Sequence, residues 1–200
     1  MSNAIRKPPK ITIEEFLEKY KDTRCEFHNG EVIGEGLPLE AQATTADHGS
    51  MQAEMVAFLI SKFGRRGGPD GGGRWWFITE AAVRYGTKSF FAHDIAGWKR
   101  NRVPKRPSGF PILERPDWVC EILSSNHVDD TVRKKNILHQ WEVPYYWIAD
   151  PLAKTLVVHE WAEKGYISVV NAEADFKGRL PPFHDLEMTL ADVFGIEEGD

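Results

Sequence analysis

Cysteine is scarce in this chain, and long apolar runs are absent. The two cysteines among the 200 residues, Cys25 and Cys120, are far apart and have no C-x-x-C or C-x-x-H neighbour. This spacing predicts neither a structural zinc site nor a disulfide framework, so both are expected to be buried thiols. No stretch approaches the ~18 apolar residues of a membrane-spanning helix. Residues 1–20 also lack the apolar core of a signal peptide, which predicts a cytoplasmic protein with no membrane segment.

The composition is close to that of ordinary globular domains. Hydrophobic residues make up 42% and charged residues 28% of the chain, which excludes disordered, collagen-like and coiled-coil classes. The length fits one hydrophobic core rather than two domains. We therefore expect a flexible tail over residues 1–10 and a single domain over residues 11–196.

The net charge of −5 hides an uneven distribution along the chain. Residues 62–135 contain fifteen Lys or Arg and eight Asp or Glu, a net charge of +7, so the remainder carries −12. A basic middle segment is typical of a surface that binds a phosphate-rich ligand, and also of a solvated loop with helix ends. Both interpretations stay open on charge alone.

Hydrophobic periodicity predicts a mixed α/β fold with an N-terminal helix and hairpin. The expected helices cover residues 12–21, 47–63, 129–141 and 186–194. The expected strands cover residues 75–85, 89–98, 117–123, 145–149, 155–161 and 166–170, after a hairpin over residues 26–32 whose turn is Asn29-Gly30.

Two segments read as loops. Residues 99–116 contain four prolines and six basic residues without any period, which predicts a long exposed loop. Loops of this length are usually functional or mobile. The glycine-rich residues 67–73 have no Lys-Ser/Thr after them, so we expect a surface loop there and not a phosphate-binding P-loop.

Acidic residues interrupt the predicted central strands. Asp94 and Glu121 each lie within a run that otherwise reads as buried strand, and Glu80 lies within the preceding strand. A buried carboxylate must be protonated, paired or bound to a metal. Two acids on neighbouring strands suit Mg²⁺ or Mn²⁺, and two structural acids satisfied by Arg or backbone donors are an equally open interpretation.

Lys134 follows Glu121 by thirteen residues, in the first turns of the next predicted helix. Helical side chains lean toward the N-terminus, which directs Lys134 back toward the Glu121 strand. The alternative is an ordinary i, i+4 pair between Asp130 and Lys134, worth about 0.3–0.5 kcal/mol, and spacing alone favours that pair.

These stretches together resemble the Uma2 (DUF820) family of restriction-endonuclease-like proteins, within the PD-(D/E)xK nuclease superfamily. The resemblance runs from about Thr12 to Phe194, and each piece is weak alone whereas the ordered set is fairly specific. The matching stretches are Arg24–Val32, the helix opening at His48, Glu80, His93–Trp98, Pro116–Ser124, Asp130 with Lys134, and Val143–Pro151.

The resemblance implies a restriction-endonuclease-like core in which Asp94 and Glu121 bind a divalent ion. Lys134, or less plausibly Lys135, would replace the lysine that the superfamily usually carries two residues after the glutamate, where this chain has Leu123. His93 stands where proline commonly precedes the aspartate.

The same resemblance implies Mg²⁺ or Mn²⁺ as cofactor and DNA as substrate. Asp94, Glu121, Lys134 and Glu80 would be catalytic, with Glu80 holding a second ion or orienting a metal-bound water, and His48 and Lys135 are accessory candidates. The expected contacts to the DNA backbone come from one loop: Lys99, Arg100, Arg102, Lys105 and Arg106.

Two other functions compete with the nuclease. A nuclease fold that no longer cuts, and binds nucleic acid or protein instead, is favoured by the missing strand lysine and the acidic overall balance. A two-carboxylate sugar hydrolase would need an acid pair and no metal, and a nearby lysine with a basic loop fits it poorly. Seven tryptophans and eleven phenylalanines exceed the expected core, which predicts an apolar self-association face and a homodimer.

Overall fold

The computed structural model describes residues 10–23, 25–34, 45–64, 74–123 and 128–195. Most of the expected tail and the glycine-rich segment 67–73 lie outside the described residues. The side chains of residues 128–131 lie outside them as well, and with them the expected pair between Asp130 and Lys134.

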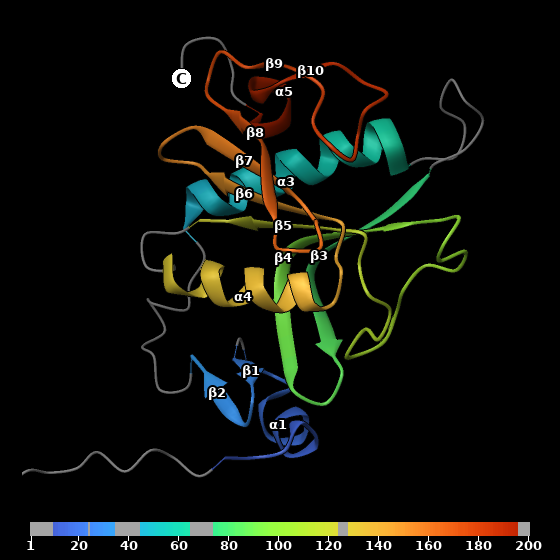
Figure 1. Cartoon of the computed structure of the whole chain (residues 1–200), viewed down its shortest axis with the longest axis vertical. Helices are drawn as coiled ribbons and strands as arrows, with labels where there is room; N and C mark the ends of the chain where they lie inside the picture. The colour runs from blue at the N-terminus through green and yellow to red at the C-terminus, as the bar shows by residue number, and fades with distance from the viewer. Residues whose placement is uncertain (1–9, 24, 35–44, 65–73, 124–127, 196–200) are drawn as a thin grey trace, which may run out of the picture.

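An eight-stranded, mostly antiparallel sheet forms the centre of the molecule (Figure 1). The strand order is β2-β1-β4-β5-β6-β7-β8, and β3 pairs with β4 beside this path. Only the pairing of β5 with β6 is parallel among those between the described strands. The strands are β1 (Glu26–His28), β2 (Glu31–Ile33), β3 (Trp75–Tyr85), β4 (Ser89–Lys99), β5 (Trp118–Ile122), β6 (Tyr145–Asp150), β7 (Thr155–Glu160) and β8 (Ile167–Ala172).

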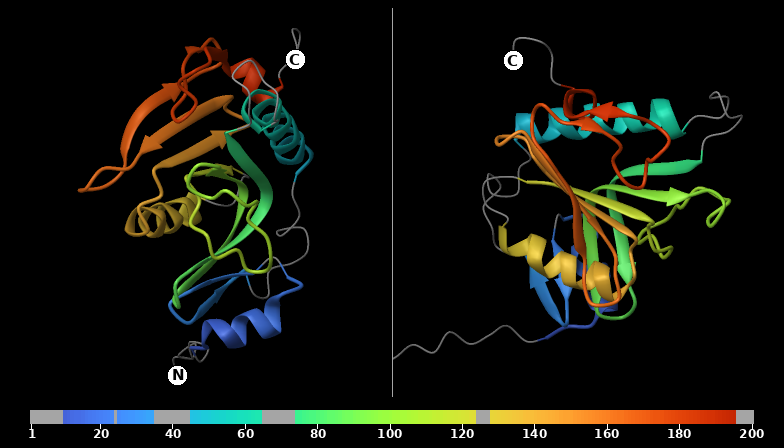
Figure 2. Two further views of the ribbon diagram at one scale, coloured as in Figure 1. Left: turned by 90° about the vertical axis from the view of Figure 1, so that its right-hand side faces the viewer. Right: turned by 45° about the horizontal axis from the view of Figure 1, so that its top comes forward.

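Two long helices cover opposite faces of this sheet (Figure 2). Met55 and Leu59 of α3 share a core with Cys120 of β5, whereas Leu138 of α4 shares a second core with Val119. Because neighbouring β5 residues enter different cores, the whole strand is apolar apart from Glu121. The helices are α1 (Ile13–Tyr20), α3 (Ala46–Leu59), which continues into a π-helical turn (Ile60–Gly64), α4 (Val128–Gln140) and α5 (Leu190–Phe194).

The N-terminal helix and hairpin form as the sequence predicts. Thr12 caps α1 through a reciprocal capping box with Glu15. Asn29 and Gly30 have φ values of 50° and 88°, which are the positive angles that the tight turn between β1 and β2 requires. Phe27 of the hairpin packs with α1 and the start of β4 in a third apolar core, so this module is attached to one end of the sheet.

The C-terminal segment differs from its prediction. Residues 186–194 were expected to form one helix, but Met188–Thr189 is a short strand, β10, paired with β9 (Lys177–Gly178), and only Leu190–Phe194 is helical. The cause is a capping box in which the Thr189 hydroxyl accepts from the Asp192 backbone N–H at 3.0 Å. That cap fixes the first helical residue at Leu190, so the residues before it are free to pair as a strand.

The long loop that follows β4 is attached to the sheet and does not project freely. The indole N–H of Trp76 donates to the Val103 carbonyl, and that of Trp98 donates to the Glu114 carbonyl, each at 3.0 Å. Ile112 also forms a bridge to Val83 of β3. The predicted loop is therefore present, and its backbone is tied to the outer strand.

The buried residues explain the composition. Both cysteines are free thiols and buried, as predicted. Trp75, Trp98, Trp118 and Trp147 are buried as well, so the aromatic surplus from which a self-association face was expected lies mainly in the core. None of the described helices is long and apolar enough to cross a membrane.

Candidate active site

The candidate site lies at a gap in the pairing of β4. Because β3 runs along one edge of β4, β1 and β5 must share the other edge. Pairing with β1 ends at Phe90, and pairing with β5 begins at Ile95. Over residues 91–94, this edge of β4 faces no partner among the described strands. Backbone groups at such a gap need other partners, and here side chains supply them.

Asp94 and Glu121 flank this gap. The last paired residues of β4 and β5 are Ile95 and Cys120, so Asp94 and Glu121 are the next residue of each strand. Directly opposite residues of an antiparallel pair project from the same face. Asp94 Oδ2 accepts the Ile122 backbone N–H at 2.6 Å, which replaces the backbone pairing that stops here. The register therefore brings the two predicted acids to one place.

Asp94 forms the open half of the site with His48. His48 is buried in the first turn of α3, after the N-cap residue Thr45, and its Nε2 lies 3.2 Å from Asp94 Oδ2. Burial alone would lower the pKa of His48, but the hydrogen bond and charge of Asp94 outweigh it and raise that pKa above 6.5. The Asp94 side chain remains 18% exposed, and the buried Nδ1 of His48 has no partner among the described residues.

Glu80 lies beside Asp94, at the rim. It has a φ of 48°, rare for a residue with a side chain, and neither it nor Asp94 appears in the pairing of β3 with β4. Instead, the amide of Gln52 from α3 donates to Glu80 Oε1 at 3.0 Å and to the Asp94 carbonyl at 2.7 Å. Gln52 thus links the exposed Glu80 to the predicted metal ligand.

Glu121 forms the closed half of the site. Its side chain is 8% exposed, and its oxygens contact Lys134 Nζ at 3.0 Å and His93 Nδ1 at 2.6 Å. Burial would raise the pKa of Glu121, but Lys134 and His93 outweigh it and lower that pKa below 4.5. Glu121 is therefore ionised at neutral pH, which suits a metal ligand and not the protonated acid that a sugar hydrolase needs.

Lys134 of α4 reaches the gap, in the direction that the lean of helical side chains toward the N-terminus suggested. Its ammonium lies 2.8 Å from Glu26 Oε1 in addition to its contact with Glu121. Burial would lower the pKa of Lys134, but the two carboxylates raise it well above 10.5. Lys134 is thus a fixed cation at the site and cannot act as a general base near neutral pH.

His93 and Tyr85 extend the buried network behind Glu121. The Tyr85 hydroxyl lies 2.7 Å from His93 Nε2, while the other ring nitrogen of His93 contacts Glu121. Both side chains are buried. Because each ring nitrogen has one partner, His93 holds the Glu121 carboxylate in a single orientation.

The donor groups fit a hard divalent ion. Each Glu121 oxygen accepts one hydrogen bond and keeps a further lone pair, and the Asp94 carboxylate reaches solvent. Among the described residues, no three His, Cys, Asp or Glu side chains form a ready metal cluster. Two carboxylates completed by backbone carbonyl and water match Mg²⁺, which usually retains several waters.

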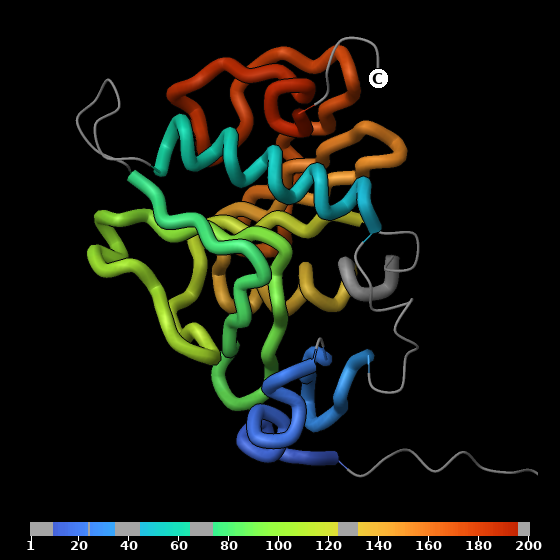
Figure 3. The backbone as a smooth tube through the Cα atoms, turned by 180° about the vertical axis from the view of Figure 1, so that it is seen from behind, coloured from blue at the N-terminus to red at the C-terminus, as the bar shows by residue number. Residues whose placement is uncertain are grey.

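Other predicted site residues lie elsewhere. Lys135 Nζ is 3.3 Å from His159 Nε2, away from the two acids, so Lys134 alone supplies the ammonium at the described site. Figures 1 and 3 show the loop after β4 at the opposite end of the molecule from the first turn of α3. Arg100 and Arg102 are engaged within the chain, with Gly64 and Asp117 respectively.

Lys99 also turns inward, over the ring of Trp75 at 5.5 Å. Lys105 and Arg106 are exposed. Only these two of the five predicted contact residues present their side chains mainly to solvent without an intrachain partner in the described part of the chain.

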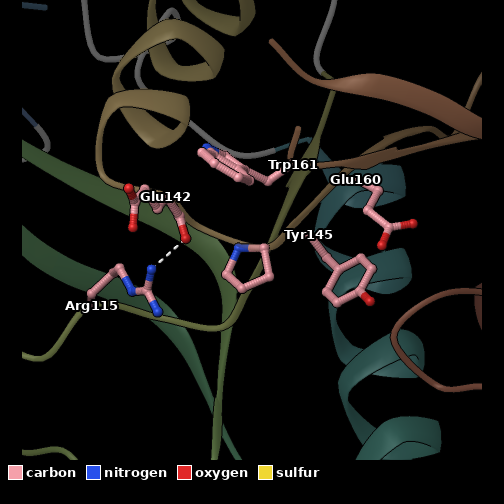
Figure 4. Close-up of a pocket in the computed structure, with 6 residues that line it drawn as sticks. Arg115, Glu142, Tyr145, Glu160 and Trp161 are labelled. Atoms are coloured by element: carbon pink, nitrogen blue, oxygen red, sulfur yellow. Dashed lines mark hydrogen bonds between the residues drawn. The ribbon is translucent and has the colours of Figure 1, made fainter. Parts of the chain in front are cut away.

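A separate shallow pocket lies near the start of β6 (Figure 4). Its volume of about 210 Å³ is smaller than the ~300–1,000 Å³ of typical small-molecule sites. Arg115, its only cation, already donates to the carbonyl of Glu142. We assign it no part in the chemistry. The pocket is lined by Arg115, Glu142, Pro144, Tyr145, Glu160 and Trp161.

Sequence reasoning did not single out Glu26, Gln52 or Tyr85. Glu26 precedes an Asn-Gly turn, so it looked like an ordinary hairpin residue, although acids inside short apolar strands are the same signal that identified Asp94. Gln52 occupies a helix position with no distinctive pattern. Tyr85 alternates correctly as a core residue, and only its hydroxyl contact in the fold reveals its role.

Comparison with known proteins places the fold. The crystal structure of "a putative nuclease belonging to DUF820" from Anabaena variabilis superposes with a TM-score of 0.70. The match covers 92% of this chain and 98% of that one, at 21% sequence identity. It confirms the predicted restriction-endonuclease-like fold. A search of curated proteins finds no match.

A family model carries the assignment further. The model of Uma2, described as "Putative restriction endonuclease", matches residues 13–191. This range contains α1, the hairpin, the whole central sheet and every residue of the candidate site. The chain therefore belongs to the Uma2 family.

Proposed function

We propose that this protein is a metal-dependent endonuclease that hydrolyses phosphodiester bonds in DNA. The observation that carries the proposal is the meeting of Asp94, Glu121 and Lys134 at the gap beside β4. Two acids and an ammonium are the groups that phosphodiester hydrolysis needs to hold a hard cation and balance phosphate charge. Family membership supports a nuclease. Restriction-endonuclease-like proteins generally use divalent metals, which supports Mg²⁺ or Mn²⁺ as the bound ion.

Asp94 and Glu121 would hold the Mg²⁺ or Mn²⁺ ion together with a backbone carbonyl near Ile122. When bound, such an ion polarises the scissile phosphate and lowers the pKa of an attacking water. His93 orients Glu121 for this task, and the Ile122 N–H orients Asp94. His48 would have to move from Asp94 Oδ2 or share it with the ion, because its imidazole lies against that oxygen.

Lys134 would stabilise negative charge on the phosphate as the bond to the attacking oxygen forms. Its ammonium, protonated at neutral pH, suits electrostatic stabilisation, and its position beside Glu121 would bring it near a phosphate held by the ion. Glu80 lies at the solvent-exposed rim, joined to Asp94 through Gln52, where its carboxylate can orient a metal-bound water or hold a second ion.

Plasmid nicking tests the proposal. Purified wild-type protein with Mg²⁺ should convert supercoiled plasmid to open circles, and Asp94→Ala should slow this by more than about a hundredfold because it removes a metal ligand. Glu160→Gln is the matched control, since it removes a carboxylate distant from the gap, and it should nick at the wild-type rate. Equal nicking by wild-type protein and Asp94→Ala, or nicking that persists in EDTA, would end the assignment.

A nuclease fold that binds without cutting remains the second candidate. It is favoured by the full pairing of Lys134 with two carboxylates and by the absence of a lysine at Leu123. Calorimetric titration with Mn²⁺ separates the two functions. The nuclease requires binding that both Asp94→Ala and Glu121→Ala abolish, whereas a binding module requires no such ion.

A further inference from the structure

A buried carboxylate on the N-terminal hairpin contacts the predicted catalytic lysine. Glu26 Oε1 lies 2.8 Å from Lys134 Nζ, slightly closer than Glu121 Oε2 at 3.0 Å. The side chains of Glu26, Glu121 and Lys134 are 11%, 8% and 10% exposed. The lysine is therefore held between two carboxylates, only one of which has a proposed metal-binding role.

The position of Glu26 is fixed by contacts other than those with Lys134. It is the first residue of β1, and the hairpin is held to the sheet by pairing of Phe27 with Phe90 and by the third apolar core. Its carboxylate also accepts the Ala92 backbone N–H at 3.3 Å, within the unpaired stretch of β4. Glu26 can thus stay in place when Glu121 changes partner.

The two carboxylates respond differently to a divalent ion. Once Glu121 binds a cation, that cation repels the Lys134 ammonium, and the share of Glu121 charge left for the lysine falls. A lysine with Glu121 as its sole partner would be expelled toward solvent under these conditions. Glu26 is a second carboxylate in contact with the ammonium and is not one of the proposed metal ligands, so its attraction opposes this expulsion.

We propose, building on the nuclease function above, that Glu26 is a positioning residue that holds the Lys134 ammonium beside Glu121 when Glu121 binds the divalent ion. Through this contact, the N-terminal hairpin becomes part of the active site although it supplies no metal ligand. The substitution of choice is Glu26→Gln, because the amide oxygen can still accept the Ala92 N–H while the charge is lost. Glu31→Gln, an exposed carboxylate on the same hairpin, is the matched control.

Reductive methylation of Lys134, read by mass spectrometry, tests the anchor without metal or DNA. Glu121→Gln removes the charge of Glu121 and so imitates a Glu121 that is neutralised by a bound ion. In this variant Glu26 should still hold Lys134, and the rate of Lys134 methylation should stay within about threefold of the wild-type rate. Adding Glu26→Gln should then raise labelling of Lys134 by about tenfold or more, whereas adding Glu31→Gln should not. Equal labelling of the Glu121→Gln single variant and the Glu26→Gln/Glu121→Gln double variant overturns the proposal.

A second measurement tests the consequence for catalysis. In single-turnover nicking with saturating Mn²⁺, Glu26→Gln should lower the rate by about ten- to a hundredfold, with Mn²⁺ affinity within about threefold of wild type. A purely structural role would lower metal affinity and folded fraction together, and that result overturns the proposal. If the double variant does not fold, Glu26→Asp in the Glu121→Gln background, with the carboxylate drawn back by one methylene, must label faster than the Glu121→Gln single variant, and equal labelling overturns the proposal.

The two assays also separate the anchor from the nuclease. Wild-type protein that neither binds Mn²⁺ nor nicks plasmid ends the proposed function, and the labelling experiment then still decides whether Glu26 holds Lys134. Nicking that depends on Asp94 but not on Glu26, with equal labelling, ends only the present inference.

Discussion

The two halves of the site are built differently, although their acids are opposite each other on neighbouring strands, directly after the last pair of β4 and β5. Asp94 is 18% exposed and contacts an imidazole from the first turn of α3. Glu121 is 8% exposed and contacts an ammonium from α4 and a second, fully buried imidazole. The sheet thus holds Glu121 in a preset orientation on its closed side and leaves Asp94 accessible. Under the proposed function, one rigid and one accessible carboxylate would admit an ion and a phosphate without rebuilding the core.

Removing the ammonium should break the closed half and have the largest effect on stability. Lys134→Met leaves Glu26 and Glu121 buried without their cation, which should lower the free energy of unfolding by about 3–5 kcal/mol. Lys135→Met, on the same helix, should lower it by less than about 1 kcal/mol because that lysine is not part of the carboxylate cluster. Urea denaturation measures both, and equal losses would contradict the comparison.

Removing the hydroxyl behind His93 should weaken the same half less. Tyr85→Phe leaves His93 Nε2 buried without a partner, which should lower the free energy of unfolding by about 1–3 kcal/mol. Tyr145→Phe alters a half-buried tyrosine outside the site and serves as the control. Chemical denaturation of the two variants in parallel provides the measurement, and a stable Tyr85→Phe protein would show that the His93 contact is dispensable.

The two halves should respond to opposite changes of pH in metal-free protein. The pKa of His48 is raised above 6.5, so the pairing of His48 with Asp94 contributes its full stabilisation of the folded protein below pH 6.5. That contribution is lost as the pH rises through the folded-state pKa of His48. The pKa of Glu121 is lowered below 4.5, so its contribution is full above pH 4.5 and is lost as the pH falls through the folded-state pKa.

His48→Gln separates these two responses. The free energy of unfolding is measured in urea, with EDTA present, across a range of pH. In wild-type protein this free energy should fall above pH 6.5 because of His48, and the variant should lack that fall. The fall below pH 4.5, which Glu121 causes, should remain in the variant. If the free energy of unfolding falls equally above pH 6.5 in the variant and in wild-type protein, the pairing of His48 with Asp94 does not stabilise the fold.

The smallest effect is expected outside both halves, at the basic loop. Lys105 and Arg106 are exposed, and under the proposed function they would contact the DNA backbone. Replacing both with Gln should make the negative slope of log affinity against log salt shallower by about 1.8. Fluorescence anisotropy of a labelled duplex over a salt series provides the measurement. An unchanged slope would remove this loop from the DNA-binding surface.

Local patterns predicted most of the fold, because they carry their own physical cause. The capping box at Thr12, the Asn29-Gly30 turn and the apolar alternation of β3 each specify structure over a few residues. The end of the chain was less predictable, since the cap at Thr189 competes with an apolar run that reads as one helix.

The site was predictable only in part. An acid inside a buried strand is visible in the sequence, so Asp94 and Glu121 could be identified, and the lean of helical side chains brought in Lys134. Glu26 could not be connected with them, because β1 and β5 share one edge of β4 only through pairings far apart in the sequence. For the basic loop, the charge density along the chain does not reveal that Arg100 and Arg102 have hydrogen-bond partners within the chain.

The most direct test of the account is a crystal of the protein soaked in Mn²⁺, with anomalous diffraction recorded. The account predicts one strong anomalous peak in contact with carboxylate oxygens of both Asp94 and Glu121, with Lys134 still against Glu26. A peak bound by only one of these carboxylates, or no peak at the gap while Mn²⁺ binds elsewhere, would contradict it.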